Sequence, residues 1–120
     1  MSTAVLLIED EPKLARNIQA YLARLGYDVH QRSNGTDGLD EFERSRPDVV
    51  LLDFRLPDMN GLEVIDRLKA LDAGVKVIMM SGVAGKQVAS EAKEAGVFCY
   101  LAKPLALKRL RELLDKAVAA

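Results

Sequence analysis

Residues 49–57 read VVLLDFRLP, a run of four apolar side chains that ends on the carboxylate of Asp53 before the chain turns away. The same pattern occurs twice more, because residues 5–8 run into an acidic turn and residues 77–80 run into Ser81. A buried strand that stops on a polar side chain presents that group at its carboxyl end. In an open parallel sheet, ligands bind at the carboxyl ends of the strands, where the strand order reverses. The pattern therefore predicts a functional site assembled from several strand ends.

The composition limits the kind of protein. With 120 residues, 49% apolar and 29% charged, the sequence suits one globular domain over residues 1–120 that buries roughly two thirds of its unfolded surface. A net charge of −1 gives no basic footprint for nucleic acid. Cys99 is the single cysteine, apolar stretches fall short of the roughly 18 residues of a membrane span, and residues 1–3 lack a basic signal-peptide start. We expect a soluble cytoplasmic protein without membrane contact or direct nucleic-acid binding.

Strand-like runs alternate with helix-like stretches along the whole chain. Strands are predicted at Val5–Ile8, Tyr27–Arg32, Val49–Asp53, Val75–Met80 and Val97–Leu101. Apolar residues at helical spacing predict three helices, which start near Leu14, Leu62 and Leu107, and weaker patterns predict two more at residues 35–45 and 86–95. Because parallel strands need long crossovers, the chain is predicted to form a doubly wound α/β fold with five parallel strands and five helices.

Helix-terminating and helix-starting residues support these boundaries. Gly26 and Gly96 fall where a helix end favours a left-handed residue. Asn60 with Glu63 three residues later resembles a capping box, and Pro12 suits the first turn of a helix. The boundaries therefore agree with the alternating pattern of strands and helices.

Three carboxylates are expected to meet at one edge of the sheet. Glu9 and Asp10 follow the first strand, and Asp53 ends its predicted neighbour. Such acids raise one another's pKa, so either one stays protonated or a hard divalent cation binds, and Mg²⁺ suits this donor set. Lys103 and Ser81 follow the two last strands and could reach the same rim, with Lys103 in salt-bridge range of Asp53. The alternative is that these are ordinary solvated loop residues.

Other chemistries of α/β proteins fit less well. The first turn, residues 9–12, reads EDEP and lacks the glycines of dinucleotide-binding and P-loop motifs. His30 is the only histidine, lies on the predicted edge strand, and no G-x-S-x-G motif accompanies it. Cys99 is interpreted as a small strand residue rather than a nucleophile.

Four motifs, in order, carry a family resemblance: IEDEP at 8–12, LLDFRLPDMNG at 51–61, MSG at 80–82 and YLAKP at 100–104. Over essentially its full length the chain resembles the receiver domain of two-component response regulators. The resemblance implies a flavodoxin-like sheet with strand order 2-1-3-4-5. It also implies a phosphorylation-controlled signalling switch, with self-catalysed transfer and autodephosphorylation only, rather than an independent enzyme.

The resemblance implies a role for each matching residue. Asp53 is the phosphoacceptor, which takes a phosphoryl group from a sensor histidine kinase or a phosphotransfer protein. Asp10, Asp53 and the backbone carbonyl of Arg55 bind Mg²⁺, while Glu9 acts through water. Lys103 neutralises a phosphoryl oxygen.

Ser81 and Tyr100 resemble the switch pair, which changes the face formed by the fourth helix, fifth strand and fifth helix. That face is expected to bind a downstream protein or effector domain, or a second copy in a phosphorylation-dependent homodimer. Arg55, which we expect to pair with Glu9, and Val83 are expected to slow hydrolysis of the acyl phosphate. Departures from the commonest pattern are Glu9, where aspartate is frequent, a glycine inside the second helix and few large apolar residues in the fourth.

Two alternatives to a stand-alone switch stay open. The chain could be a receiver module excised from a longer transcription factor or hybrid kinase, or a phosphate-insensitive scaffold with the same fold. An aspartate-based phosphatase is disfavoured, because that class needs a second acid two residues after the nucleophile, where this chain has Arg55.

Overall fold

The computed structural model describes residues 2–82 and 86–120. Its sheet has five parallel strands in the order β2-β1-β3-β4-β5. The strands are β1 (Ala4–Ile8), β2 (Asp28–Arg32), β3 (Val49–Asp53), β4 (Val77–Ser81) and β5 (Cys99–Ala102). The helices are α1 (Pro12–Arg24), α2 (Gly35–Ser45), α3 (Gly61–Leu71), α4 (Lys86–Ala95) and α5 (Leu107–Ala119). The predicted doubly wound fold and strand order are confirmed.

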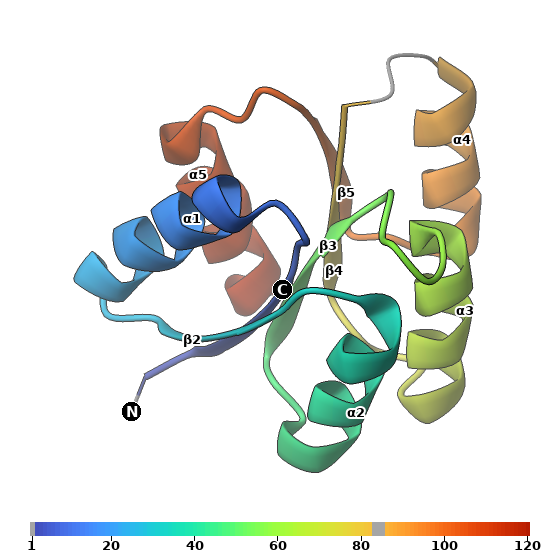
Figure 1. Ribbon diagram of the computed structural model, residues 1–120, viewed down its shortest axis with the longest axis horizontal. Helices are drawn as coiled ribbons and strands as arrows, with labels where there is room; N and C mark the ends of the chain where they lie inside the picture. Colours follow the sequence, from blue (N-terminus) through green and yellow to red (C-terminus); the bar gives the residue numbers. More distant parts are fainter. Residues whose placement is uncertain (1, 83–85) are drawn as a thin grey trace.

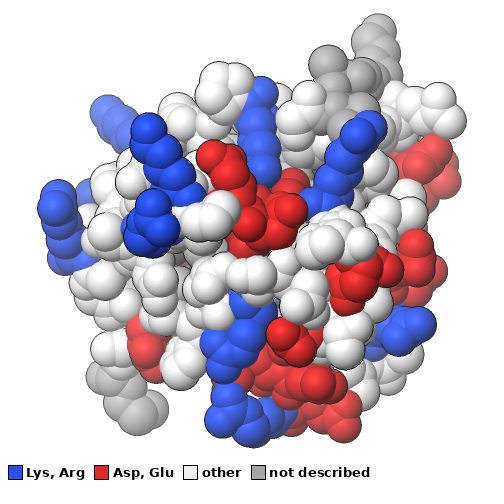
Figure 2. All heavy atoms as spheres, viewed as in Figure 1, with Lys and Arg blue, Asp and Glu red and all other residues white. Residues whose placement is uncertain are grey.

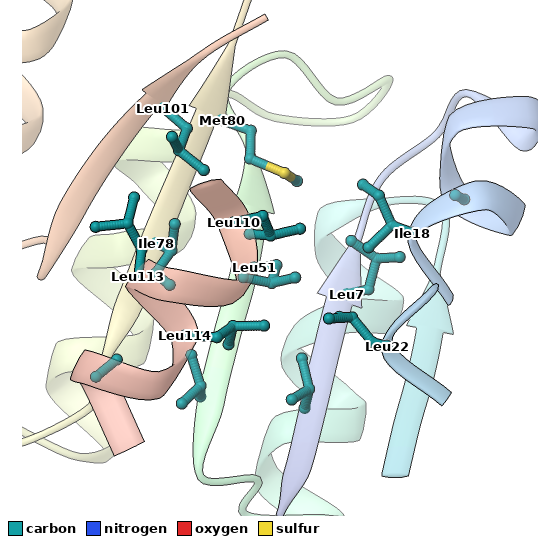
Figure 3. Packing of buried hydrophobic residues seen from close by; sticks show 14 residues of the cluster. Leu7, Ile18, Leu22, Leu51, Ile78, Met80, Leu101, Leu110, Leu113 and Leu114 are labelled. Carbon is teal, nitrogen blue, oxygen red and sulfur yellow. The ribbon is translucent and has the colours of Figure 1, made fainter. Parts of the chain in front are cut away.

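Helices cover both faces of the sheet, with α1 and α5 on one side and α2, α3 and α4 on the other (Figure 1). Successive strand residues point to opposite faces, so Leu7 and Leu51 pack beneath α1 and α5 (Figure 3) while Leu6 and Leu52 pack against the other layer. This two-sided burial explains why β1, β3 and β4 read as continuous apolar runs. The residues of the edge strand β2 are exposed or half-buried, and none is fully buried.

Three strands begin later in the structure than predicted, because apolar side chains also occur in the turns between the preceding helices and these strands. The amide of Tyr27 donates to the carbonyl of Leu22 at 3.1 Å, and the amide of Val97 donates to the carbonyl of Ala92 at 3.2 Å. The Val75 amide likewise bonds back to a turn carbonyl rather than to a neighbouring strand. These amide hydrogen bonds therefore belong to the turns before the strands, although the side chains of the three residues are at least partly buried.

The predicted helix ends have the expected geometry. Gly26 and Gly96 have φ angles of 92° and 95°, in the left-handed region that glycine adopts without steric cost. Asn60 Oδ1 accepts the Glu63 amide at 3.0 Å, as in a capping box. In the described part of the chain, none of the helices has the length and apolar character to span a membrane.

Strand register brings the functional residues to one edge of the sheet. Ile8 lies beside Leu52 in the ladder, so Glu9 and Asp53 follow adjacent strand positions. Ser81 is the last residue of β4 and pairs with Ala102, directly before Lys103. The strand order reverses at β1 and β3, which is where α/β sheets place their ligand crevice.

Gly38 on α2 predicts a measurable packing constraint. A Cβ at this position would lie 2.5 Å from Cδ1 of the buried Ile8, so we expect Gly38→Ala to destabilise the fold by about 1 kcal/mol. Overpacking costs roughly 1–3 kcal/mol and outweighs the gain of about 1 kcal/mol in helix propensity. Ile8→Val in the Gly38→Ala background should recover part of the loss in chemical denaturation. A Gly38→Ala protein as stable as wild type would show that Ile8 moves aside freely.

Candidate functional site

Three carboxylates meet at the carboxyl ends of β1 and β3, as predicted. One carboxylate oxygen from each of Glu9, Asp10 and Asp53 lies within 4.8 Å of the others. Glu9 is 0% exposed and Asp53 is 5% exposed, whereas Asp10 faces solvent. The cluster thus has two buried acids and one that water reaches.

The ammonium of Lys103 lies between the two buried acids. Its Nζ atom is 2.8 Å from Glu9 Oε1 and 3.2 Å from Asp53 Oδ1. The backbone holds this lysine in place, because the Lys103 amide donates to the Ser81 carbonyl at 2.8 Å. The predicted contact with Asp53 is present, and the structure adds a shorter contact with Glu9.

Burial dominates the proton affinities of the two buried acids. It raises the pKa of both Glu9 and Asp53, because desolvation disfavours a carboxylate and the lowering effect of Lys103 does not fully compensate. Burial alone would lower the pKa of Lys103, but the hydrogen bond from its ammonium to Glu9 and the charges of both acids raise it. Lys103 therefore stays charged, while the acids carry an excess of negative charge.

The acidic turn after β1 is fixed by the neighbouring edge strand. The Glu9 amide donates to the carbonyl of Arg32 at 3.0 Å. In the other direction, the Gln31 side chain donates to the Glu9 carbonyl at 2.9 Å. The sequence interpretation missed Gln31, since a glutamine on an alternating edge strand carries no signal of its own.

A cleft of about 440 Å³ opens beside the phosphoacceptor candidate and is lined by Asp53, Arg55, Gly82 and Lys103. Acidic side chains gather near the middle of the face shown in Figure 2, with basic side chains around them. An anionic group that entered this cleft would meet Lys103 beside Asp53.

The structure places the predicted switch pair, Ser81 and Tyr100, on β4 and β5. Ser81 ends β4 and is 2% exposed, one position past the Met80 carbonyl that accepts the Phe54 amide at 2.8 Å. Tyr100 lies on β5, half-buried against the core layer beneath α2, α3 and α4. Val83 lies outside the described residues.

The prediction that Arg55 pairs with Glu9 is wrong. Glu9 pairs with Lys103, and within residues 2–82 and 86–120 no ion pair joins it to Arg55. The reason is burial, because Glu9 is enclosed at the end of β1, while Arg55 is exposed in the loop after β3.

With the fold and this cluster established, comparison with known proteins gives the class. The model of the response regulator receiver domain matches residues 5–115. The chain belongs to this family, whose members act as signalling switches.

Known relatives and structures agree with this assignment. Sporulation initiation phosphotransferase F of Bacillus subtilis (strain 168) is 31% identical over 116 residues, 97% of this chain and 94% of that protein. The regulatory protein AtoC of Escherichia coli (strain K12) is 32% identical over 95% of this chain, which spans only 25% of AtoC. A CheY-like receiver domain protein from Methanospirillum hungatei JF-1 has a TM-score of 0.94 at 26% identity, covering 99% of this chain and 95% of its own.

Asp53→Asn is expected to stabilise the metal-free protein at neutral pH, on the order of 1 kcal/mol, because it removes one of several like charges that share one ammonium. The raised pKa values of Glu9 and Asp53 exceed the ordinary 4.5 and 3.8. An acid with a raised folded-state pKa contributes stability at low pH that is lost as the pH rises through that pKa. The advantage of Asp53→Asn over wild type should therefore shrink as the pH falls toward about 4.

Denaturation curves of both proteins with a chelator present measure this difference. Asp66→Asn on the exposed face of α3 is the matched control and should show no such trend. A lower stability of Asp53→Asn at pH 7 would mean that the Lys103 contact outweighs the repulsion.

Proposed function

We propose that this chain is a phosphorylation-controlled switch in which Asp53 accepts a phosphoryl group from a phosphohistidine. The donor would be a sensor histidine kinase or a phosphotransfer protein. The observation that carries the proposal is the buried Asp53 carboxylate beside the Lys103 ammonium, at 3.2 Å, in a cleft open to a phosphoryl group. Membership of the receiver family supports the same function.

Magnesium fits the donor set that the chain offers. Carboxylate oxygens are the ligands that Mg²⁺ prefers, and three of them lie within 4.8 Å of one another. We infer that Asp10, Asp53 and the backbone carbonyl of Arg55 would hold the ion, with Glu9 acting through water. The bound ion would supply positive charge against the phosphoryl oxygens.

The proposed transfer forms one bond and breaks one bond. An oxygen of Asp53 attacks phosphorus, the phosphorus–nitrogen bond of the donor breaks, and the imidazole nitrogen keeps the electron pair and takes up a proton. Lys103 stays protonated and neutralises a phosphoryl oxygen. Because phosphoryl transfer has a loose transition state, positioning and charge neutralisation provide the catalysis, and the protein needs no separate enzymatic activity.

We propose that Ser81 and Tyr100 couple phosphorylation to the face formed by α4, β5 and α5. A hydrogen bond from Ser81 to a charged phosphoryl group is worth about 1.5–3 kcal/mol. Reversing a 1:99 population needs roughly 5.5 kcal/mol, so Lys103 and the metal must contribute, or a partner must select the active form. Arg55, which lines the cleft beside Asp53, is proposed to slow hydrolysis by restricting an in-line water.

The partners and the output are also part of the proposal. A downstream protein, an effector domain or a second phosphorylated copy would bind the α4–β5–α5 face. We propose that residues 1–120 act as one receiver unit in the cytoplasm. Because the chain spans about a quarter of regulators such as AtoC, either a stand-alone switch or a module of a longer regulator is compatible with the match.

Asp53 is expected to be the only residue labelled when the protein is incubated with acetyl phosphate and Mg²⁺. Intact-mass measurement should show one phosphoryl group on wild type and none on Asp53→Asn, while Asp66→Asn is labelled like wild type. Circular dichroism would confirm that both variants are folded. A wild-type protein that takes no label would instead support the phosphate-insensitive scaffold.

Asp10→Ala is expected to weaken Mg²⁺ binding more than Glu9→Ala, because Asp10 is proposed to contact the ion directly and Glu9 through water. Isothermal titration calorimetry measures both affinities. Even groups that only orient a metal ligand change affinity by about 10- to 100-fold when they are lost, so we expect a loss of at least about tenfold for Asp10→Ala. Glu11→Ala is the control, since its carboxylate is not one of the three in the cluster. Equal affinity in wild type and Asp10→Ala would rule out the proposed metal site.

A further inference from the structure

The loop that follows Asp53 is closed at its base. The Gly61 amide donates to the Phe54 carbonyl at 2.6 Å, and Arg55 forms an isolated antiparallel bridge with Asn60. The two sides of the loop are in direct contact here, because a Cβ at Gly61 would lie only 3.0 Å from the Phe54 Cα. The base therefore limits how far residues 54–61 can move as a unit.

The tip of the same loop is fastened to helix α2. The carboxylate of Asp58 accepts three hydrogen bonds, from the Gly35 amide at 2.8 Å, the Thr36 amide at 2.9 Å and the Thr36 hydroxyl at 2.7 Å. The next residue packs at the same place, because a Cβ at Gly35 would lie 2.5 Å from Met59 Cγ. Two independent contacts thus join the loop tip to the first turn of α2.

The contact suits a carboxylate in particular. The amino end of a helix carries partial positive charge and free amides, and Asn34 already accepts the Asp37 amide at 2.8 Å. The Asp58 carboxylate accepts hydrogen bonds from the two preceding helix amides, those of Gly35 and Thr36. Desolvation opposes the ionisation of Asp58, but the hydrogen bonds from the Thr36 hydroxyl and the Gly35 and Thr36 amides together outweigh it and lower the pKa of Asp58 to about 2.

We propose that Asp58 is a positioning residue for the phosphoacceptor site, because it clamps the loop that carries Arg55 beside Asp53 to helix α2. The inference rests on the proposed function, in which the Arg55 carbonyl is a ligand of Mg²⁺. A loop held only at its base would spend less time with that carbonyl in place. Groups that orient a metal ligand from outside typically change affinity by 10- to 100-fold when they are lost.

The test compares Mg²⁺ affinity in three variants under conditions where circular dichroism shows each to be fully folded. Asp58→Ala should weaken Mg²⁺ binding roughly tenfold, and its labelling rate with acetyl phosphate should approach that of wild type at saturating Mg²⁺. Thr36→Val removes one of the three hydrogen bonds and should cause a smaller loss. Asp37→Ala removes a charge from the same turn, where Asp37 contacts Asn34 at 3.0 Å rather than the loop, and should bind like wild type.

Each outcome decides the inference. If wild type binds Mg²⁺ and is labelled, two results would overturn the clamp. One is wild-type Mg²⁺ affinity in folded Asp58→Ala, and the other is a loss of affinity in Asp37→Ala as large as that in Asp58→Ala. A wild-type protein that neither binds Mg²⁺ nor takes a phosphoryl group would overturn the proposed function, and the clamp with it. If Asp58→Ala does not fold, Thr36→Val decides the question, since it leaves the Asp58 carboxylate and both amide bonds in place.

Discussion

The ammonium of Lys103 between the carboxylates of Glu9 and Asp53 is the interaction on which this site depends. Desolvated carboxylates repel one another and are costly to ionise unless a cation is close. Here one cation, at 2.8 and 3.2 Å, serves two acids that are at least 95% buried. The arrangement leaves negative charge uncompensated at the sheet edge, so the site favours a second cation, and the raised pKa of Lys103 keeps its ammonium charged.

The fold explains how these residues meet although up to 94 positions separate them in sequence. Each lies at the end of a strand or directly after one, and parallel register aligns the carboxyl ends of β1, β3, β4 and β5. Side chains beyond these ends leave the apolar layers together. The rigid sheet thus positions the acids and the lysine, whereas Arg55 is placed by a loop that depends on its own contacts.

The contact between Asp58 and α2 links that loop to the helix that follows the edge strand β2. Its three short hydrogen bonds use the helix amino end as an anchor. Gly35 allows the close approach of Met59, just as Gly38 allows the approach of Ile8 on the same helix. Helix α2 therefore packs against both β1 and the loop after β3, and the glycine inside it has a steric cause.

The presence of five strands and five helices, and the meeting of Glu9, Asp10, Asp53 and Lys103, could be predicted from the sequence, because burial and strand periodicity act locally and parallel strands share one carboxyl edge. The partner that each charged side chain takes, by contrast, depends on how the elements pack together. Glu9 pairs with Lys103 rather than Arg55 since its carboxylate is enclosed, a depth that no local pattern encodes. The Asp58 contact with α2 and the Gln31 contact with Glu9 likewise join separate elements, so only their packing in three dimensions created them.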